Sequence, residues 1–182
     1  MLSHRAVQPD DIPSICEFPQ SPEELYFLFP KGTYPLTPEQ LRRSIEQRFG
    51  STVVLDQGRV CAFANLYCMK PEGTSGIGNV IVAPDVRGKG VGRYLIETMI
   101  RTALRERGAR SVQIACFNAN VSGLLLYQKL GFEPYMIEPR LDHQARRIAL
   151  VRMRLSEAAT AKYAPALGVR FPNSTCRTAD DV

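Results

Sequence analysis

The chain has 182 residues, of which 45% are hydrophobic and 23% are charged, and its formal net charge is +5. This composition excludes a disordered or fibrous chain, and the length predicts one domain with little room for a second. No apolar run is long enough to cross a membrane and no apolar leader opens the chain, so we expect neither a membrane span nor a signal peptide.

Helical and strand patterns alternate along the chain up to Leu155. In chain order we expect a strand at 2–7, a helix capped by Asp10 or Asp11, a short helix at 21–29, a helix that opens with a capping box at 37–40 and stops at Gly50, strands at 51–56, 59–68 and 79–83, a helix from 91 to 107, a strand at 111–116, a helix from 120 to 130, and strands at 132–137 and 147–155. This order predicts one α/β domain around a mixed sheet, over residues 1–155. After Ser156 the periodicity ends, and residues 156–182 read as a C-terminal tail with no role that the sequence indicates.

The cysteines and histidines predict no metal site. The five cysteines are odd in number and form no C-x-x-C pair, and the two histidines, His4 and His143, are far apart. Zinc sites and disulfide frameworks need closer or paired spacing, so we expect neither. A chain without a disulfide framework fits a reducing, cytoplasmic location.

A strand, a glycine loop and a long amphipathic helix follow one another at residues 79–107. Unpaired N–H groups and the helix dipole at such a junction attract anions, and glycines let a phosphate come close to the backbone. The P-loop pattern fails because position 83 is alanine, and the dinucleotide fingerprint fails because positions 93 and 95 are not glycine. What remains is R-x-x-G-x-G, satisfied by Arg87, Gly90 and Gly92 after Pro84.

A second motif lies about 30 residues further on. Asn120 stands seven residues before Tyr127, inside a segment that ends Leu-Tyr-Gln-Lys-Leu-Gly-Phe at Phe132. Both motifs, in this order, resemble the GCN5-related N-acetyltransferases (GNAT family) over residues 2–155. The resemblance implies a single GNAT-type α/β domain, whose mixed central sheet contains two splayed parallel strands and is flanked by helices.

The resemblance also implies where acetyl-coenzyme A, the co-substrate, would bind. The pantetheine arm would pair with the first splayed strand, and the pyrophosphate would meet the glycine loop. The coenzyme-binding residues implied are Val80, Ile81, Val82, Arg87, Gly88, Lys89, Gly90, Val91, Gly92, Arg93 and Asn120.

Tyr127 is the catalytic residue that the resemblance implies, as the general acid that protonates the departing thiolate. Many family members have a glutamate five residues before the asparagine, but this chain has Ala115 there. The general base is therefore unassigned, with Glu23 or Glu24 acting through water, or solvent alone, as the alternatives. On the acceptor side we expect Glu24, Tyr26 and Tyr34 to contact the substrate.

Together these features predict an N-acetyltransferase that moves an acetyl group to a primary amine by direct attack in a ternary complex. The resemblance implies that residues 1–50 build the acceptor side. They contain seven acidic and five basic side chains, which favours a cationic acceptor such as a peptide lysine or a small cationic amine. Residues 87–110 hold seven basic and two acidic residues. We read part of this block as a counter-charge for the coenzyme, and we expect no nucleic-acid or membrane partner and a monomer or homodimer.

Simpler readings stay open for the same residues. Asn120 could only cap its helix, and Tyr127 could only fill the core. An acyl-coenzyme A sensor without catalytic activity would keep the glycine loop, and an enzyme for a longer acyl donor would keep both motifs.

Overall fold

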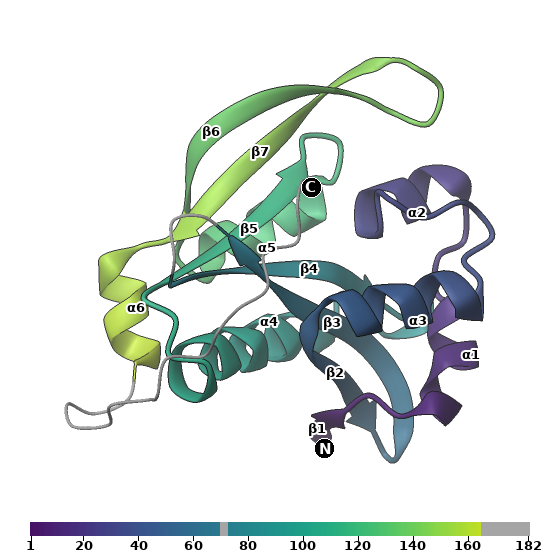
Figure 1. Cartoon of the computed structure of the whole chain (residues 1–182), viewed down its shortest axis with the longest axis horizontal. Helices are drawn as coiled ribbons and strands as arrows, with labels where there is room; N and C mark the ends of the chain where they lie inside the picture. The colour runs from purple at the N-terminus through teal and green to yellow at the C-terminus, as the bar shows by residue number, and fades with distance from the viewer. Residues whose placement is uncertain (70–72, 165–182) are drawn as a thin grey trace.

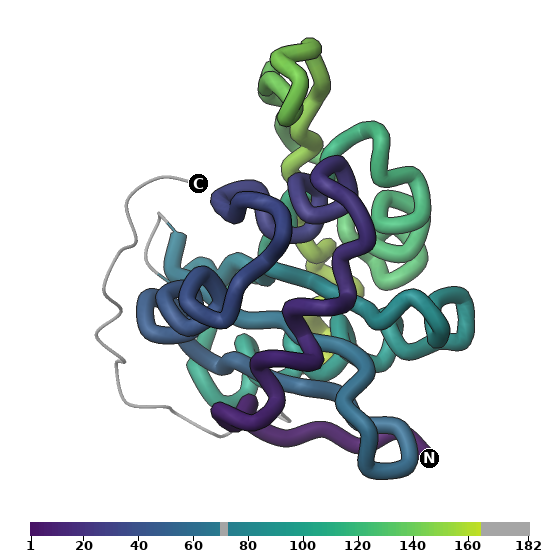
Figure 2. The backbone as a smooth tube through the Cα atoms, turned by 90° about the vertical axis from the view of Figure 1, so that its right-hand side faces the viewer, coloured from purple at the N-terminus to yellow at the C-terminus, as the bar shows by residue number. Residues whose placement is uncertain are grey.

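A seven-stranded mixed sheet runs through the molecule, with helices on both faces (Figures 1 and 2). The computed structural model describes residues 1–69 and 73–164. In chain order its elements are β1 (Leu2–Ala6), the 3-10 turn η1 (Pro9–Asp11), α1 (Ile12–Cys16), α2 (Pro22–Leu28), α3 (Pro38–Gln47), β2 (Phe49–Asp56), β3 (Arg59–Met69), β4 (Thr74–Val82), the 3-10 turn η2 (Pro84–Val86), α4 (Val91–Arg101), its π-helical extension η3 (Thr102–Glu106), β5 (Ser111–Phe117), α5 (Val121–Lys129), β6 (Phe132–Leu141), β7 (Arg147–Leu155) and α6 (Glu157–Tyr163).

The strands lie in the order β1-β2-β3-β4-β5-β7-β6. Neighbouring strands pair antiparallel, except β4 and β5, which are parallel. Residues 61–68 of the central strand β3 are all buried, because α4 packs on one face of the sheet and α1 and α3 lie on the other (Figure 2). Burial on both faces explains why this strand is a continuous apolar run rather than an alternating one.

The parallel strands β4 and β5 separate half-way along their length. They pair from Thr74 with Ser111 to Ile77 with Ile114, and no pairing continues beyond Ile77. At this point β4 carries one extra residue relative to β3, and Asn79 has a positive φ of 51°. Such a bulge bends a strand and increases its twist. The bulge therefore accounts for the divergence that leaves the far halves of β4 and β5 open to a ligand.

Most of the expected elements are present, and the differences have local causes. The side chain of Thr37 caps α3 by accepting from the Gln40 amide, but the Gln40 side chain donates to the carbonyls of Thr33 and Pro35 instead of closing a capping box. The helix ends at Gln47, so Phe49 begins β2 rather than continuing α3. The sequence prediction also began the β4 strand five residues late, because its first half is rich in glycine.

The expected tail begins with a helix. Ser156 caps α6 by accepting from the Ala159 amide, and Tyr163 at its end is buried. Residues 157–163 therefore form a helix rather than an irregular tail, while residues 165–182 lie outside the described part of the chain. None of the described helices is long and apolar enough to cross a membrane. Cys16, Cys61 and Cys116 are free thiols, whereas Cys68 is disulfide-bonded, contrary to our expectation from the cysteine count.

Candidate functional site

A cavity of about 310 Å³ opens where β4 and β5 separate. Its walls come from the open edges of the two strands, from α5, from α3 and β3, from the end of α2 and the segment that follows it, and from the β6–β7 hairpin. The lining residues are Tyr26 to Lys31, Gln40, Arg43, Ser44, Gln47, Arg48, Tyr67, Ile77 to Val80, Ile114 to Phe117, Asn120, Tyr127, Arg140 and Leu150. The structure thus brings four of the expected site residues, Val80, Asn120, Tyr127 and Tyr26, to one cavity.

Tyr127 lies on α5 and is buried, with its ring edge-on to Phe132 at 6.2 Å between centroids. The described residues give its hydroxyl no hydrogen-bond partner, although the side chain lines the cavity. Burial, reinforced by the neighbouring Cys116, raises the pKa of the phenol well above its ordinary value. The phenol is therefore protonated at neutral pH and can donate a proton into the cavity.

Cys116 also lines the cavity, but burial raises the pKa of its thiol to about 12. A thiol with such a pKa is neutral at physiological pH, and the neutral form is a poor nucleophile. The raised pKa therefore argues against a covalent intermediate on this residue.

Asn120 is the N-cap of α5, where its Oδ1 accepts from the Gly123 amide at 3.0 Å and from the Ser122 hydroxyl at 3.2 Å. The capping role is confirmed. In this role the side-chain NH₂ group of Asn120 has no acceptor among the described residues, and the Asn120 side chain lines the cavity. Capping the helix and contacting a ligand are therefore compatible.

The glycine loop between η2 and α4 presents unpaired backbone amides. Gly88 and Gly90 have positive φ angles of 74° and 87°, and a Cβ on either would meet no atom within 4 Å. Within the described residues, the amides of Gly88, Gly90, Val91, Gly92 and Arg93 have no hydrogen-bond acceptor. Unpaired amides at a helix start, on glycines with no side chain in the way, are what a phosphate site requires.

The basic side chains of this loop behave differently from one another. Lys89 is exposed, and Arg93 pairs with Glu97 one turn along α4 at 3.4 Å. Arg87 turns away from the loop, where it donates to the Val82 carbonyl at 3.0 Å and forms an ion pair with Glu24. Arg87 therefore joins the loop to the start of α2, and its side chain is not aimed at the loop amides.

The acceptor-side carboxylates are engaged elsewhere. Besides its pair with Arg87, Glu24 accepts from the Gln20 amide at 2.9 Å, and Glu24 does not line the cavity. Glu23 lies 3.8 Å from Arg146 of the β6–β7 hairpin. Neither carboxylate lines the cavity, so the structure supports neither a base role for Glu23 or Glu24 nor the expected substrate contact of Glu24.

Two tyrosines were expected at the acceptor side, and one of them is there. Tyr26 lines the cavity, packs at 4.8 Å from the Phe117 ring and donates to the Leu141 carbonyl at 2.6 Å. Tyr34 is 41% exposed, does not line the cavity and donates to the Gln20 carbonyl at 3.4 Å. Its expected substrate contact is therefore not supported.

Residues of α3 and β3 also line the cavity, and none of them was among the site residues predicted from the sequence. Asn65 and Asn79 both donate to the Ser44 hydroxyl, at 3.3 and 2.6 Å, and this bonding fixes α3 against the bulge of β4. Arg48 and Tyr67 lie beside them. The pattern Gly76-x-Gly78 was the available signal, because a Cβ at either glycine would collide with Tyr67 or Arg48.

The charge of the lining contradicts the premise of a cationic acceptor. Among the described lining residues there is no Asp or Glu, whereas Lys31, Arg43, Arg48 and Arg140 are present. None of the seven acidic residues of the first 50 reaches the cavity, but three of the five basic ones do. The acidic excess of this segment is therefore not a property of the cavity that it borders.

The chain is similar to known acetyltransferases. A family model for the acetyltransferase (GNAT) family matches residues 14–132. The ribosomal protein bS18-alanine N-acetyltransferase of Escherichia coli (strain K12) is 27% identical over 99 residues, which cover 54% of this chain and 65% of that protein. The chain spans less than two thirds of the length of the curated relatives that it matches, and only 25% of an uncharacterised N-acetyltransferase from Bacillus subtilis.

Solved structures of the same kind share the fold. A GCN5-related N-acetyltransferase from Kribbella flavida is 32% identical, with a TM-score of 0.67 and coverage of 84% of this chain and 96% of that chain. A putative acetyltransferase from Salmonella typhimurium, solved with its cofactor acetyl-CoA, has a TM-score of 0.68 at 21% identity and covers 97% and 99% of the two chains. The family match, the sheet order and the splayed strands agree, and the chain belongs to the GNAT acetyltransferase family.

Proposed function

We propose that the protein is an acetyl-CoA-dependent N-acetyltransferase that transfers the acetyl group directly to a primary amine in a ternary complex. The observation that carries the proposal is the meeting of the splayed strands, Asn120 and Tyr127 in one cavity. The β4 strand leads from that cavity to the glycine loop, so one continuous path joins a proton donor to a phosphate-type site.

The coenzyme would follow that path. The unpaired amides of Gly88 and of Gly90 to Arg93, with the Lys89 and Arg93 side chains beside them, suit the pyrophosphate, because they combine free donors with positive charge. The backbone of Val80, Ile81 and Val82 has no partner strand on the β5 side and suits the pantetheine arm. Arg87 would act by holding the loop rather than by contacting the coenzyme, since its guanidinium is bound to Val82 and Glu24.

The chemistry needs few groups. The amine nitrogen attacks the thioester carbonyl carbon, and a backbone N–H of β4 polarises the carbonyl oxygen. The C–S bond breaks, and the Tyr127 hydroxyl protonates the departing thiolate. The described lining includes no carboxylate to take up the proton that the amine loses. We assign that proton to solvent, and we expect the rate to follow the fraction of neutral amine as pH rises.

A sensor without catalytic activity is the second candidate, but it would need no proton donor in the cavity. The test is release of free coenzyme A thiol from acetyl-CoA across a panel of primary amines, with the acetylated product identified by mass. Thiol release matched by acetylated amine supports the enzyme. Binding of acetyl-CoA without thiol release for any amine supports the sensor, and faster turnover with propionyl- or butyryl-CoA would assign a longer donor.

A further inference from the structure

The acceptor end of the cavity is positively charged. Four basic side chains line it, from α3, β6 and the segment after α2, and the described lining contributes no acidic side chain. One of the four, Arg140, is paired with Glu138 at 2.7 Å, so the positive charge at this end comes mainly from the α3 side. Arg43 is exposed, and the described residues give it no ion pair. Such a field repels a cationic acceptor and attracts an anionic one.

Arg48 is the most constrained of these cations. Its Nη1 donates to the Asn65 Oδ1 at 3.0 Å, and its guanidinium lies 4.8 Å from the centroid of the Tyr67 ring. The absence of a Cβ at Gly78 leaves the space that the guanidinium occupies. Strands β3 and β4 thus hold this side chain in a fixed position on the cavity wall.

Arg48 is half-buried, yet no described carboxylate neutralises it. Burial lowers the pKa of its guanidinium. Because a buried cation without a counter-charge is unfavourable, the position is explained by an anion that is supplied from outside the chain. A guanidinium offers five N–H donors in a planar fork, and the bond to Asn65 uses one of them, so several remain for a carboxylate or phosphonate.

The coenzyme phosphates are not the natural partner of this cation. Arg48 lies against Gly78, whereas the glycine loop begins after Val82 at the end of β4. Four residues of strand separate the two places by about 13 Å. Arg48 therefore lies on the side of the splayed strands that is remote from the phosphate-type site.

We propose that the acceptor is a small primary amine that also carries an anionic group, such as a carboxylate, and that Arg48 binds this group. The proposal rests on the acetyl transfer proposed above and names its substrate class. Arg48 then determines specificity by placing the amine, with Arg43 adding attraction at the mouth of the cavity. An amine without the anion would leave Arg48 uncompensated in the complex.

The experiment compares each amino acid in a panel with the amine made by removing its carboxylate, in the thiol-release assay with acetyl-CoA. A matching set of aminophosphonates separates carboxylate from phosphonate recognition. For the wild type we expect kcat/KM to favour the anionic partner of a pair by about 10- to 100-fold. In Arg48→Gln we expect that preference to vanish through a rise in KM for the anionic amine, with KM for acetyl-CoA unchanged.

Arg42→Gln is the matched control, since Arg42 is the exposed neighbour of Arg43 on α3 and does not line the cavity. It should keep the wild-type preference.

The wild-type comparison decides the proposal even if Arg48→Gln fails to fold. If the wild type uses the decarboxylated amines as well as or better than the amino acids, the anion site is overturned while acetyl transfer stands. An equal loss for both members of each pair in Arg48→Gln would make Arg48 structural only. If no amine releases thiol, acetyl transfer itself fails. The anion site is then tested by the midpoint of thermal unfolding. The amino acids should raise this midpoint in the wild type and not in Arg48→Gln, and an unchanged midpoint in the wild type would overturn the anion site.

Discussion

Tyr127 combines a buried ring with a hydroxyl that has no partner among the described residues, and this combination makes its role testable. In Tyr127→Phe the ring stays in contact with Phe132, so the fold should be unchanged. Loss of the proton donor should lower kcat by about 10²- to 10⁴-fold, with little change in KM for acetyl-CoA. Steady-state kinetics and a thermal unfolding curve measure both quantities.

Tyr94→Phe is the control, because the Tyr94 hydroxyl bonds to His4 outside the cavity. Turnover of Tyr127→Phe within twofold of the wild type would rule out the general-acid role. The raised pKa of Tyr127 adds a second readout: the phenol loses its proton only above its ordinary value of about 10, so activity should not fall between pH 7 and 9.

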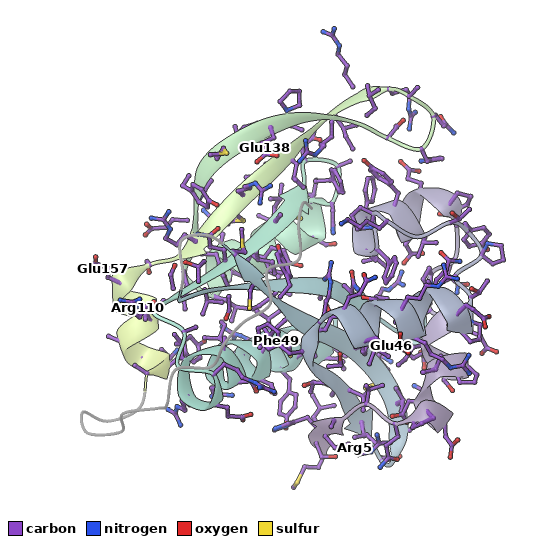
Figure 3. All side chains as sticks on the ribbon, viewed as in Figure 1. Arg5, Glu46, Phe49, Arg110, Glu138 and Glu157 are labelled. Carbon is purple, nitrogen blue, oxygen red and sulfur yellow. The ribbon has the colours of Figure 1, made fainter. Side chains whose placement is uncertain are left out.

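Asp11 makes the stability of the first segment depend on pH. Arg5, labelled in Figure 3, donates to both of its carboxylate oxygens, at 2.6 and 2.8 Å, and the Gln8 amide donates at 2.7 Å. These bonds outweigh burial and hold the pKa of Asp11 below its ordinary value. The stabilisation is therefore complete above pH 4 and is lost as pH falls through the lowered pKa.

Asp11→Asn should lower the free energy of unfolding by about 1.5–3 kcal/mol at pH 7. The difference from the wild type should shrink below about pH 4, as the wild-type carboxylate becomes protonated. Urea unfolding at several pH values measures it. A difference that stays constant from pH 7 to pH 3 would contradict the role of the ionised carboxylate.

At the scale of single residues, the sequence predicts the role of a side chain when its partners are near in the chain. Asn120 and Tyr127 are seven residues apart, about two helical turns, so spacing alone places them on one face of α5. Glu24 and Arg48 are different, because the groups that fix them, Arg87 and Gly78, are distant in sequence. No local pattern distinguishes a carboxylate in a long-range ion pair from one in a cleft.

The glycine loop is the element on which coenzyme binding depends, and the chain provides a matched comparison for it. Gly90 and Gly58 have similar φ angles, 87° and 83°, and open space at the Cβ position. Gly58 lies in the β2–β3 turn, away from the cavity. Alanine at either position should therefore introduce the same backbone strain, about 1–2 kcal/mol.

Only Gly90→Ala should weaken acetyl-CoA binding, because Gly90 is the N-cap of α4 and its amide is one of the unpaired amides of the loop. We expect Kd to rise at least about tenfold, which corresponds to about 1.4 kcal/mol. Calorimetric titration and urea unfolding separate the two effects. Equal acetyl-CoA affinity in Gly90→Ala and Gly58→Ala would show that the loop does not contact the coenzyme.

Elements were predictable where their signals are local. Ser21, Thr37 and Asn120 cap helices as their sequence context indicates, and glycine follows α5 at Gly131 with a positive φ of 92°. The bulge at Asn79 was not predictable, because asparagine in a strand becomes a bulge only through pairing with β3 and bonding to Ser44. The separation of β4 and β5, which creates the cavity, follows from that tertiary contact.

For the whole molecule, net charge is a poor guide to the site. The formal total is +5, and the first 50 residues are acidic on balance, yet the cavity is lined by basic side chains alone among its charged residues. The acidic residues of that segment either lie on the surface or pair with arginines that do not line the cavity, as Glu24 does with Arg87 and Asp11 does with Arg5. The fold, rather than the composition, decides which charges face a ligand.

The contacts of helix α6 bear on where the folded domain ends. Tyr163 is 3% exposed, Arg105 of η3 donates to its carbonyl at 2.8 Å, and the Arg101 guanidinium lies 5.6 Å from its ring. The helix, whose first residue Glu157 is labelled in Figure 3, therefore packs beside α4 and its extension η3. A disordered tail would contribute no such contacts.

Tyr163→Ala should lower the free energy of unfolding by about 3 kcal/mol, because it removes a buried aromatic ring from the junction of α6 with α4. Lys162→Ala is the control: Lys162 is exposed on the same helix, and its cation–π contact with Tyr163 should contribute about 1 kcal/mol or less. Both variants should keep the wild-type KM for acetyl-CoA, since neither residue lines the cavity. Urea unfolding measures the difference. If Tyr163→Ala is no less stable than Lys162→Ala, α6 is not part of the cooperative unit, and the domain ends near Leu155 after all.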